Sequence, residues 1–389
     1  MTGLADRGRR WLRTSAVTSS VTSSAPLVVP LALLVTFLVT SLFVIAAGAD
    51  PFDAFFRFLI QPLMSTGTFL EVLVSATPIL FTGTAVAIAF RAGYYNIGAE
   101  GQLLAGAIAA AGLGMVLGGL PSIVALPLMI VGGALAGAAW ALGPALLRVR
   151  LGIDEVVTTL LLNPVALLLV NALLNGPWRD PETGFPESAP IAASAEFPQL
   201  IARSRVHLGL VVALAIVGIA WFVVTRTSAG LKLRAVGSSP RAAAFAGLNV
   251  NGTLLRAALI SGAIAGVAGV SEVAGIQDRL TGGLSSGFGF TGIVVATLGG
   301  LSMPGVAAAA FLLGDLRVGA SSAARALDIP SQVGEIVQAT LLLVTIATLA
   351  ILSRRRSSAG DARDAGDASG AGSDPGGSIE GDGALEPGR

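Results

Sequence analysis

The sequence predicts an all-α, polytopic membrane protein with about ten transmembrane helices, and three observations lead to that prediction. The chain is 53% hydrophobic and 12% charged, and its mean hydropathy of +0.80 lies far from the composition of soluble globular proteins. Apolar runs of about 20 residues, the length that crosses the hydrocarbon core of a bilayer, recur along the chain. Arginines gather in the short segments between these runs, where they set membrane topology.

The apolar segments follow one another with short connections. In order they cover residues 27–49, 69–90, 97–118, 122–147, 155–175, 207–225, 254–276, 290–302, 304–321 and 332–352. The eighth is short and glycine-rich, so a re-entrant or broken helix stands beside a full crossing as an interpretation. The first has a basic start like a signal peptide, but its apolar run is too long for one, so we interpret it as a span.

Basic clusters flank the first, fourth, sixth and last segments, at 7–13, 148–150, 226–256 and 354–356. Ten crossings place all four clusters on one side of the membrane, and the positive-inside rule makes that side the cytoplasm. The opposing loop at 176–206 mixes basic with acidic residues, as an outside loop does. We therefore predict a plasma-membrane protein with both termini in the cytoplasm.

Three regions follow from this layout. Residues 1–24 form a cytoplasmic N-terminal segment, residues 25–353 a transmembrane domain, and residues 354–389 an acidic cytoplasmic tail. The tail is rich in Gly, Ser, Asp and Glu, so it buries too little apolar surface to fold, and we expect disorder.

The composition also excludes several kinds of site. The chain has no cysteine and one histidine, His207, which leaves neither a disulfide framework nor a zinc site. Its only lysine, Lys232, is followed by leucine, so there is no P-loop for ATP. The net charge of +1 argues against a nucleic-acid partner. We expect no catalytic residue, no metal and no cofactor in this chain.

The basic loop at 226–256 contains a complete short helix. Ser239 is suited to its N-cap, Pro240 to its first position, Arg241–Ala246 to its body and Gly247 to its stop. Two turns of helix are unstable alone in water because nucleation costs more than so few hydrogen bonds return. We therefore expect this helix to pack against a partner protein.

Polar residues at membrane depth are costly unless they are paired or face water. Asn163, with Pro164 after it, opens the backbone of the fifth span, and Glu272 lies late in the seventh. For both we favour a solvated pathway over simple pairing with a neighbouring helix.

In two segments, 90–106 and 282–300, glycines and aromatic residues come just before an apolar helix. One segment lies in each half of the chain. Interrupted segments in both halves point to a transport site near the midplane. Asn96 is able to cap the helix after it, with Glu100 favoured in its first turn by the helix dipole. Capping alone would account for both residues, so capping and transport stay open for them.

Five stretches carry a family resemblance: FRAGYYNIGAEGQLLAGA, GIDEVVTTLLLN, LRAVGSSPRAAAFAGLNV, SGAIAGVAGVSEVAGIQDRL and GFGFTGIVVATLGG. Together they resemble the permease subunits of bacterial ABC importers, in the group that includes branched-chain amino-acid and ribose permeases. The nearest likeness is to the nucleoside or simple-sugar branch. The resemblance covers about residues 70–350, in order and with the spacing intact.

The resemblance implies a permease domain that moves a small solute inward by alternating access, driven by ATP bound on cytoplasmic ABC ATPase subunits. It also implies a second permease subunit, identical or related, an extracellular substrate-binding lipoprotein and surrounding membrane lipid. The short loop helix would dock into the ATPase, with Phe245 as its apolar knob and Arg241 at the rim. The solute pathway would hold Asn96, Glu100, Asn163, Glu272, Phe288 and Phe290.

Two alternatives remain from the sequence. An ion-coupled secondary transporter would use Glu272 or Asp315 as a proton carrier. A membrane-embedded enzyme ranks below it, because no reactive set of residues can be named.

Overall fold

The computed structural model describes residues 34–327 and isolated helical positions between 332 and 348. Two predicted regions, 1–24 and 354–389, and most of the predicted tenth span therefore lie outside the described residues. Within the described range the regular structure is helical, with isolated bridges and no strand. The elements are Leu34–Ala46, α2 (Pro51–Leu59), α3 (Gln61–Met64), α4 (Thr66–Arg91), α5 (Ala99–Val116), α6 (Ser122–Leu151), α7 (Glu155–Leu174), α8 (Leu208–Arg226), α9 (Ser228–Ser238), α10 (Pro240–Phe245), α11 (Val250–Glu272, continued by a π-helical turn to Gln277), α12 (Phe288–Leu298) and α13 (Met303–Leu327).

Seven described helices are long and apolar enough to cross a membrane, namely α4, α5, α6, α7, α8, α11 with its π turn, and α13. The helices Leu34–Ala46 and Pro51–Leu59 meet at a bend of 118°, and counting them as one broken span raises the number to 8. The prediction of about ten transmembrane helices is therefore not supported, although the polytopic all-α class is confirmed.

The short eighth segment explains part of that difference. With 11 residues, α12 is about 16 Å long at 1.5 Å per residue, roughly half the thickness of a hydrocarbon core. A sharp turn at residues 299–302 then leads into α13. The high hydropathy of α12 reflects burial among other helices rather than a membrane crossing, since most of the α12 side chains are buried.

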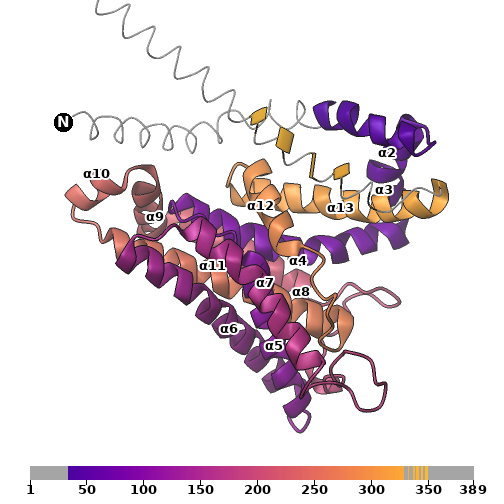
Figure 1. The fold of residues 1–389 in the computed structure, drawn as a ribbon, viewed down its shortest axis with the longest axis horizontal. Helices are drawn as coiled ribbons and strands as arrows, with labels where there is room; N and C mark the ends of the chain where they lie inside the picture. Colours follow the sequence, from indigo (N-terminus) through magenta and orange to yellow (C-terminus); the bar gives the residue numbers. More distant parts are fainter. Residues whose placement is uncertain are drawn as a thin grey trace, which may run out of the picture.

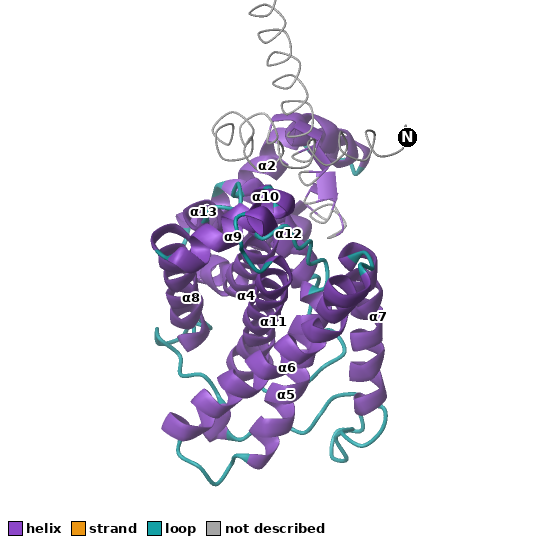
Figure 2. Cartoon of the chain, turned by 90° about the vertical axis from the view of Figure 1, so that its left-hand side faces the viewer, coloured by secondary structure: helices purple, strands orange, loops and turns teal. Residues whose placement is uncertain are grey.

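The centre of the bundle is built on α4 and α11, which Figure 2 shows between α8 on one side and α7 on the other. Small residues let α11 approach α5 and α6 closely. A Cβ atom added to Gly106 on α5 would lie 2.1 Å from the carbonyl oxygen of Gly266, and one on Gly137 of α6 would lie 2.2 Å from that of Gly262. Such backbone contact replaces the hydrophobic effect that is missing between helices in lipid.

The two ends of the bundle differ. The first, which we call the α10 end, carries α9 and α10 beyond the bundle, and the opposite end carries the long loop between α7 and α8 (Figure 1). The exposed side chains of α7 and α8 between these ends are largely apolar, including Leu161, Leu168, Leu214 and Phe222. Those faces suit contact with lipid tails.

Candidate functional site

Two interrupted helices meet with their N-termini inside the bundle. The carboxylate of Glu100, in the first turn of α5, accepts a hydrogen bond of 2.7 Å from the backbone N–H of Gly289 at the start of α12. Thr82 of α4 donates to the carbonyl of Phe288 at 2.9 Å. One carboxylate thus serves two helix N-termini, where the partial positive charge of the peptide dipoles favours an anion. We call this meeting point the junction.

The junction lies inside the bundle, beside the middle of α4. Thr82 stands nine residues before Arg91, the last residue of α4 at the α10 end. At 1.5 Å per residue that places it about 13 Å along the helix from that end, close to the middle of a bilayer core.

A ladder on α7 holds the segment that leads into α5. Glu155 accepts from Tyr95 N–H at 3.3 Å, and Thr159 accepts from Ile97 N–H at 3.2 Å. Asn163 donates to the carbonyl of Ile97 and accepts from Gly101 N–H, both at 2.9 Å. The three α7 residues are spaced four apart and so share one face of the helix. All three are buried, and this ladder holds residues 95–101 against α7.

Asn96 belongs to the junction as well, because it links the start of α5 to α11, but it is not the N-cap of α5. Gly98 occupies the N-cap of α5, which corrects the capping interpretation of Asn96. The fully buried Asn96 amide instead accepts from Gly98 N–H at 2.9 Å and from Gln102 Nε2 at 3.0 Å. It also donates to Gln102 at 2.8 Å and to Ser261 of α11 at 2.9 Å. A buried amide with its bonds made is a structural element of high rigidity.

The second region is a charged cavity of about 460 Å³ between α4, α11 and α13. Its lining contains two carboxylates, three guanidinium groups, four hydroxyl side chains and one aromatic ring, together with apolar side chains. These residues are Thr68, Glu71, Val74, Ser75, Arg205, Glu272, Ile276, Phe288, Arg317, Val318, Ser321, Ser322 and Arg325. Five charged side chains around an open space fit a solvent-accessible cavity rather than a packed apolar core.

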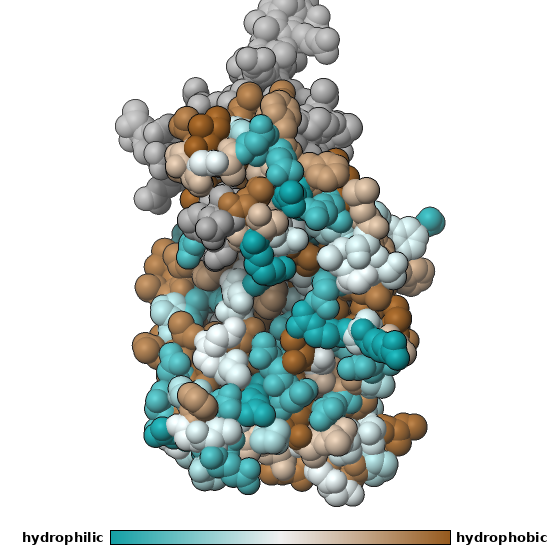
Figure 3. All heavy atoms as spheres, turned by 90° about the vertical axis from the view of Figure 1, so that its right-hand side faces the viewer, coloured by the Kyte–Doolittle hydropathy of each residue, from teal (hydrophilic) through white to brown (hydrophobic). Residues whose placement is uncertain are grey.

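The cavity has a rim and a floor. At the rim, Arg205 from the loop before α8 forms an ion pair with Glu71 near the start of α4. At the floor, the guanidinium of Arg317 lies 4.5 Å from the centre of the Phe288 ring and donates to the carbonyl of Ser286 at 3.4 Å. Glu272 lines the wall with 5% of its surface exposed. Figure 3, which faces the side of the molecule away from α10, shows hydrophilic residues among hydrophobic ones over the middle and lower part of that side.

The structure therefore divides the six residues predicted for a pathway. It places Glu272 and Phe288 in the cavity, and it brings Asn96, Glu100 and Asn163 together in the junction. Phe290 is 43% exposed and stands apart from the residues that line the cavity. Sequence reasoning missed Arg205, Arg325 and Thr159. Arg317 and Arg325 are eight residues, just over two turns, apart on α13, and both line the cavity.

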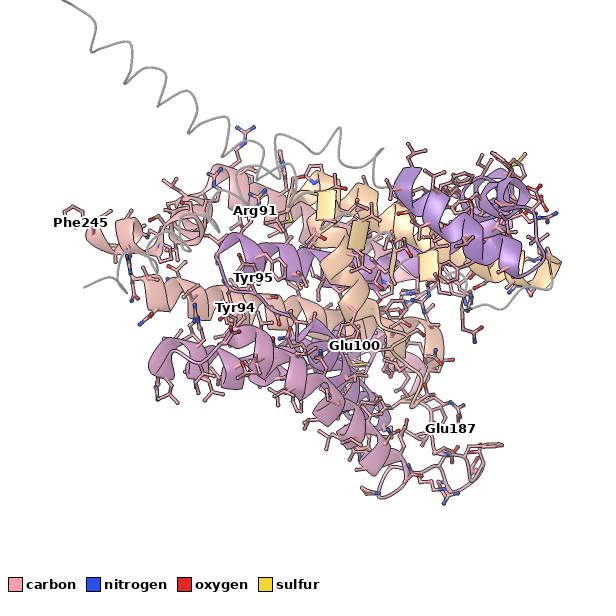
Figure 4. The ribbon with its side chains drawn as sticks, turned by 45° about the horizontal axis from the view of Figure 1, so that its top comes forward. Arg91, Tyr94, Tyr95, Glu100, Glu187 and Phe245 are labelled. Atoms are coloured by element: carbon pink, nitrogen blue, oxygen red, sulfur yellow. The ribbon has the colours of Figure 1, made fainter. Side chains whose placement is uncertain are left out.

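The short helix at the α10 end has the predicted form. The hydroxyl of Ser239 accepts from Ala242 N–H at 3.3 Å, Pro240 begins the helix, and Gly247 has a φ of +80° just after it. Arg241 follows Pro240 in the first turn. Phe245 is 98% exposed, and Figure 4 shows it at the tip of the molecule, pointing away from the bundle. The exposed Phe245 ring is therefore available at the position where the sequence predicts contact with an ATPase subunit.

Comparisons with known proteins give a consistent result. Residues 68–346 match the family described as branched-chain amino acid transport system / permease component. The chain is 37% identical to the glucose ABC transporter permease protein TsgB13 of Haloferax volcanii, over 82% of this chain and 87% of that protein. It is 38% identical to the guanosine ABC transporter permease protein NupP of Bacillus subtilis, over 72% and 81%. It is 30% identical to the nucleoside ABC transporter permease protein NupB of Lactococcus lactis, over 78% and 85%.

Proposed function

The chain belongs to the permease-component family of ABC transporters and is a membrane-spanning transport subunit rather than an enzyme; within that role, we propose that it carries nucleosides or related simple sugars into the cell. The named relatives act on guanosine, nucleosides and glucose, which are uncharged, hydroxyl-rich solutes. Family membership also decides against the ion-coupled secondary transporter and the membrane-embedded enzyme.

The charged cavity is the observation that carries the proposed pathway. Its carboxylates accept hydrogen bonds from ribose or pyranose hydroxyls, and its guanidinium groups donate to ring oxygens or to base carbonyls. Phe288 at its floor adds an apolar surface for one face of a sugar or a base. Such a mixture of a few polar groups with an aromatic surface is typical of small-molecule sites.

The family implies ATPase and substrate-binding partners for this multi-pass plasma-membrane protein. We assign the α10 end to the cytoplasm, because the arginine-rich segment 226–256 lies there. The cavity rim would then face outward, toward a substrate-binding lipoprotein. The two termini would be cytoplasmic, and ATP would be bound by the ATPase subunits. A second permease, identical or related, would complete the membrane part.

Phe245 is the proposed contact with the ATPase, and one pair of variants tests it. Phe245→Asp places a charge on the exposed tip of α10, whereas Phe185→Asp places one on the 67% exposed Phe185 in the loop at the opposite end. We expect the first to release the ATPase from tagged complexes and the second to keep it. Equal recovery of ATPase with both variants would exclude this contact.

The solute class is tested by uptake into vesicles that contain the complex isolated through a tag on this chain. With ATP and the binding lipoprotein supplied, we expect uptake of labelled guanosine, uridine or glucose and none of leucine. Leucine uptake without nucleoside or sugar uptake would overturn the proposed class while leaving the family assignment intact.

A further inference from the structure

One point of contact joins the short helix at the α10 end to both interrupted helices. Gly237, near the end of α9, lies against the backbone at the end of α4. A Cβ atom added to it would be 2.0 Å from the carbonyl oxygen of Arg91. Gly93, with a φ of +79°, faces it, since its own added Cβ would be 3.4 Å from the Gly237 Cα. Two backbones in direct contact transmit displacement without the slack of a side chain.

From this contact one route leads to α12. The Arg91 side chain donates from Nε to the carbonyl of Leu301 at 2.7 Å. Leu301 lies in the turn between α12 and α13 with a φ of +56°, a left-handed conformation that is costly for a leucine. The surrounding structure must therefore hold this turn, and the guanidinium of Arg91 is part of that support.

The other route leads to α5. Gly93 begins the short segment that the α7 ladder holds at Tyr95 and Ile97, and that segment ends at the first turn of α5. The two routes meet again where the Glu100 carboxylate accepts from Gly289 N–H. Figure 4 shows Phe245, then Arg91 and Tyr95, then Glu100 following one another along the molecule.

We propose that the contact of Gly237 with Arg91 and Gly93 is the mechanical joint that carries movement of α10 to the starts of α5 and α12, and so to the cavity floor at Phe288. This role for the joint depends on the proposed contact of α10 with an ATPase subunit. Its physical basis is a continuous chain of rigid contacts: the Arg91–Leu301 hydrogen bond lies on the α12 branch, and the hydrogen bonds of the α7 ladder lie on the α5 branch. Gly237 and Arg91 are positioning residues and touch no solute.

The cysteine-free chain allows a direct test that needs no solute. A Phe290→Cys variant carries an environment-sensitive fluorophore on the exposed side of α12, in the complex isolated with its ATPase subunits. We expect ATP binding to change the emission. Adding Gly237→Ala or Arg91→Gln should reduce that change at least about fivefold while ATPase subunits still co-purify. The matched controls Gly218→Ala, where an added Cβ meets nothing within 4 Å, and the exposed Arg150→Gln should keep the full change.

An undiminished change in both joint variants would overturn the inference, and so would a complex with bound ATPase whose α12 label never responds to ATP. Because Arg91→Gln leaves the backbone intact, it keeps the test decisive if Gly237→Ala does not assemble. A complex that moves α12 but takes up neither nucleosides nor sugars would refute the proposed solute class and leave the joint standing.

Discussion

The junction and the charged cavity are both polar regions inside an apolar bundle, yet they are built in opposite ways. In the junction, the Asn96 amide and the Glu100 carboxylate are bonded to partners within the protein. In the cavity, five charged side chains surround about 460 Å³ of open space. The first arrangement rigidifies a fold. In the second, even the groups that have partners, such as the Arg205–Glu71 ion pair, face an open space that a solute or water can enter.

The two regions share the first residues of α12. The Phe288 ring is part of the cavity lining, whereas the Phe288 carbonyl and the Gly289 N–H are bonded in the junction. A change at the cavity floor therefore reaches the junction through one or two peptide units. Polar residues in one bundle thus have different roles according to whether they are packed against other residues or face an open space.

The largest effect is expected from breaking the junction at Asn163. Asn163→Ala leaves the buried Gly101 N–H and the partly buried Ile97 carbonyl without this partner, at a cost of about 2–4 kcal/mol of folding free energy. Asn171→Ala, on the exposed side of the same helix, is the matched control and should cost under about 0.5 kcal/mol. Thermal unfolding of purified protein measures both, and equal stability of the two variants would refute the structural role of the junction.

The second prediction concerns the buried His207, which lies at the start of α8 close to Arg205 of the cavity rim, and it is a pH dependence of stability. Its ring is 1% exposed and caps α8, with Nδ1 accepting from Gly209 N–H at 3.1 Å. Burial lowers the pKa of His207 to about 4, so the unfolded chain binds the proton first as the pH falls. Stability is therefore highest above pH 6.5 and falls by up to about 3 kcal/mol toward pH 4.

Melting curves between pH 7.5 and 4.5 check this expectation. His207→Asn keeps an acceptor at the N-cap without a titrating ring, so its pH dependence in this window should be flatter. A variant as pH-sensitive as the native chain would show that other groups cause the loss.

How far could these regions be predicted? Hydropathy identified the long helices, and Ser239, Pro240 and Gly247 marked the ends of α10 because caps are local signals. Hydropathy also counted α12 as a candidate span, since it does not distinguish burial in protein from burial in lipid. Tyr95 and Ile97, which Glu155 and Thr159 hold in the ladder, lie about 60 residues earlier, so only the tertiary fold reveals the ladder.

The cavity should respond to Glu272→Gln with little loss of stability and a larger loss of transport. The change removes a charge from the wall but keeps the size of the side chain. We expect uptake to fall about tenfold, equivalent to about 1.4 kcal/mol, with melting within about 0.5 kcal/mol of the native chain. Native uptake by this variant would remove Glu272 from the pathway.

The smallest effect is expected at the rim. Arg205 and Glu71 form an ion pair whose side chains are 61% and 34% exposed, and such pairs contribute under about 1 kcal/mol. Arg205→Gln, Glu71→Gln and the double variant give a coupling energy by double-mutant cycle. A coupling above about 2 kcal/mol would mean that this pair is a structural element like those of the junction.

Single cysteines test the contrast between the two regions most directly, because the chain has none of its own. Ser322→Cys lies in the cavity lining, and Ser261→Cys replaces a fully buried junction hydroxyl. A membrane-impermeant thiol reagent added from outside should label the first, more slowly with guanosine or glucose present, and leave the second unlabelled. Labelling of Ser261→Cys at the same rate, or an unreactive Ser322→Cys, would contradict the assignment of the cavity to the solute and the junction to the fold.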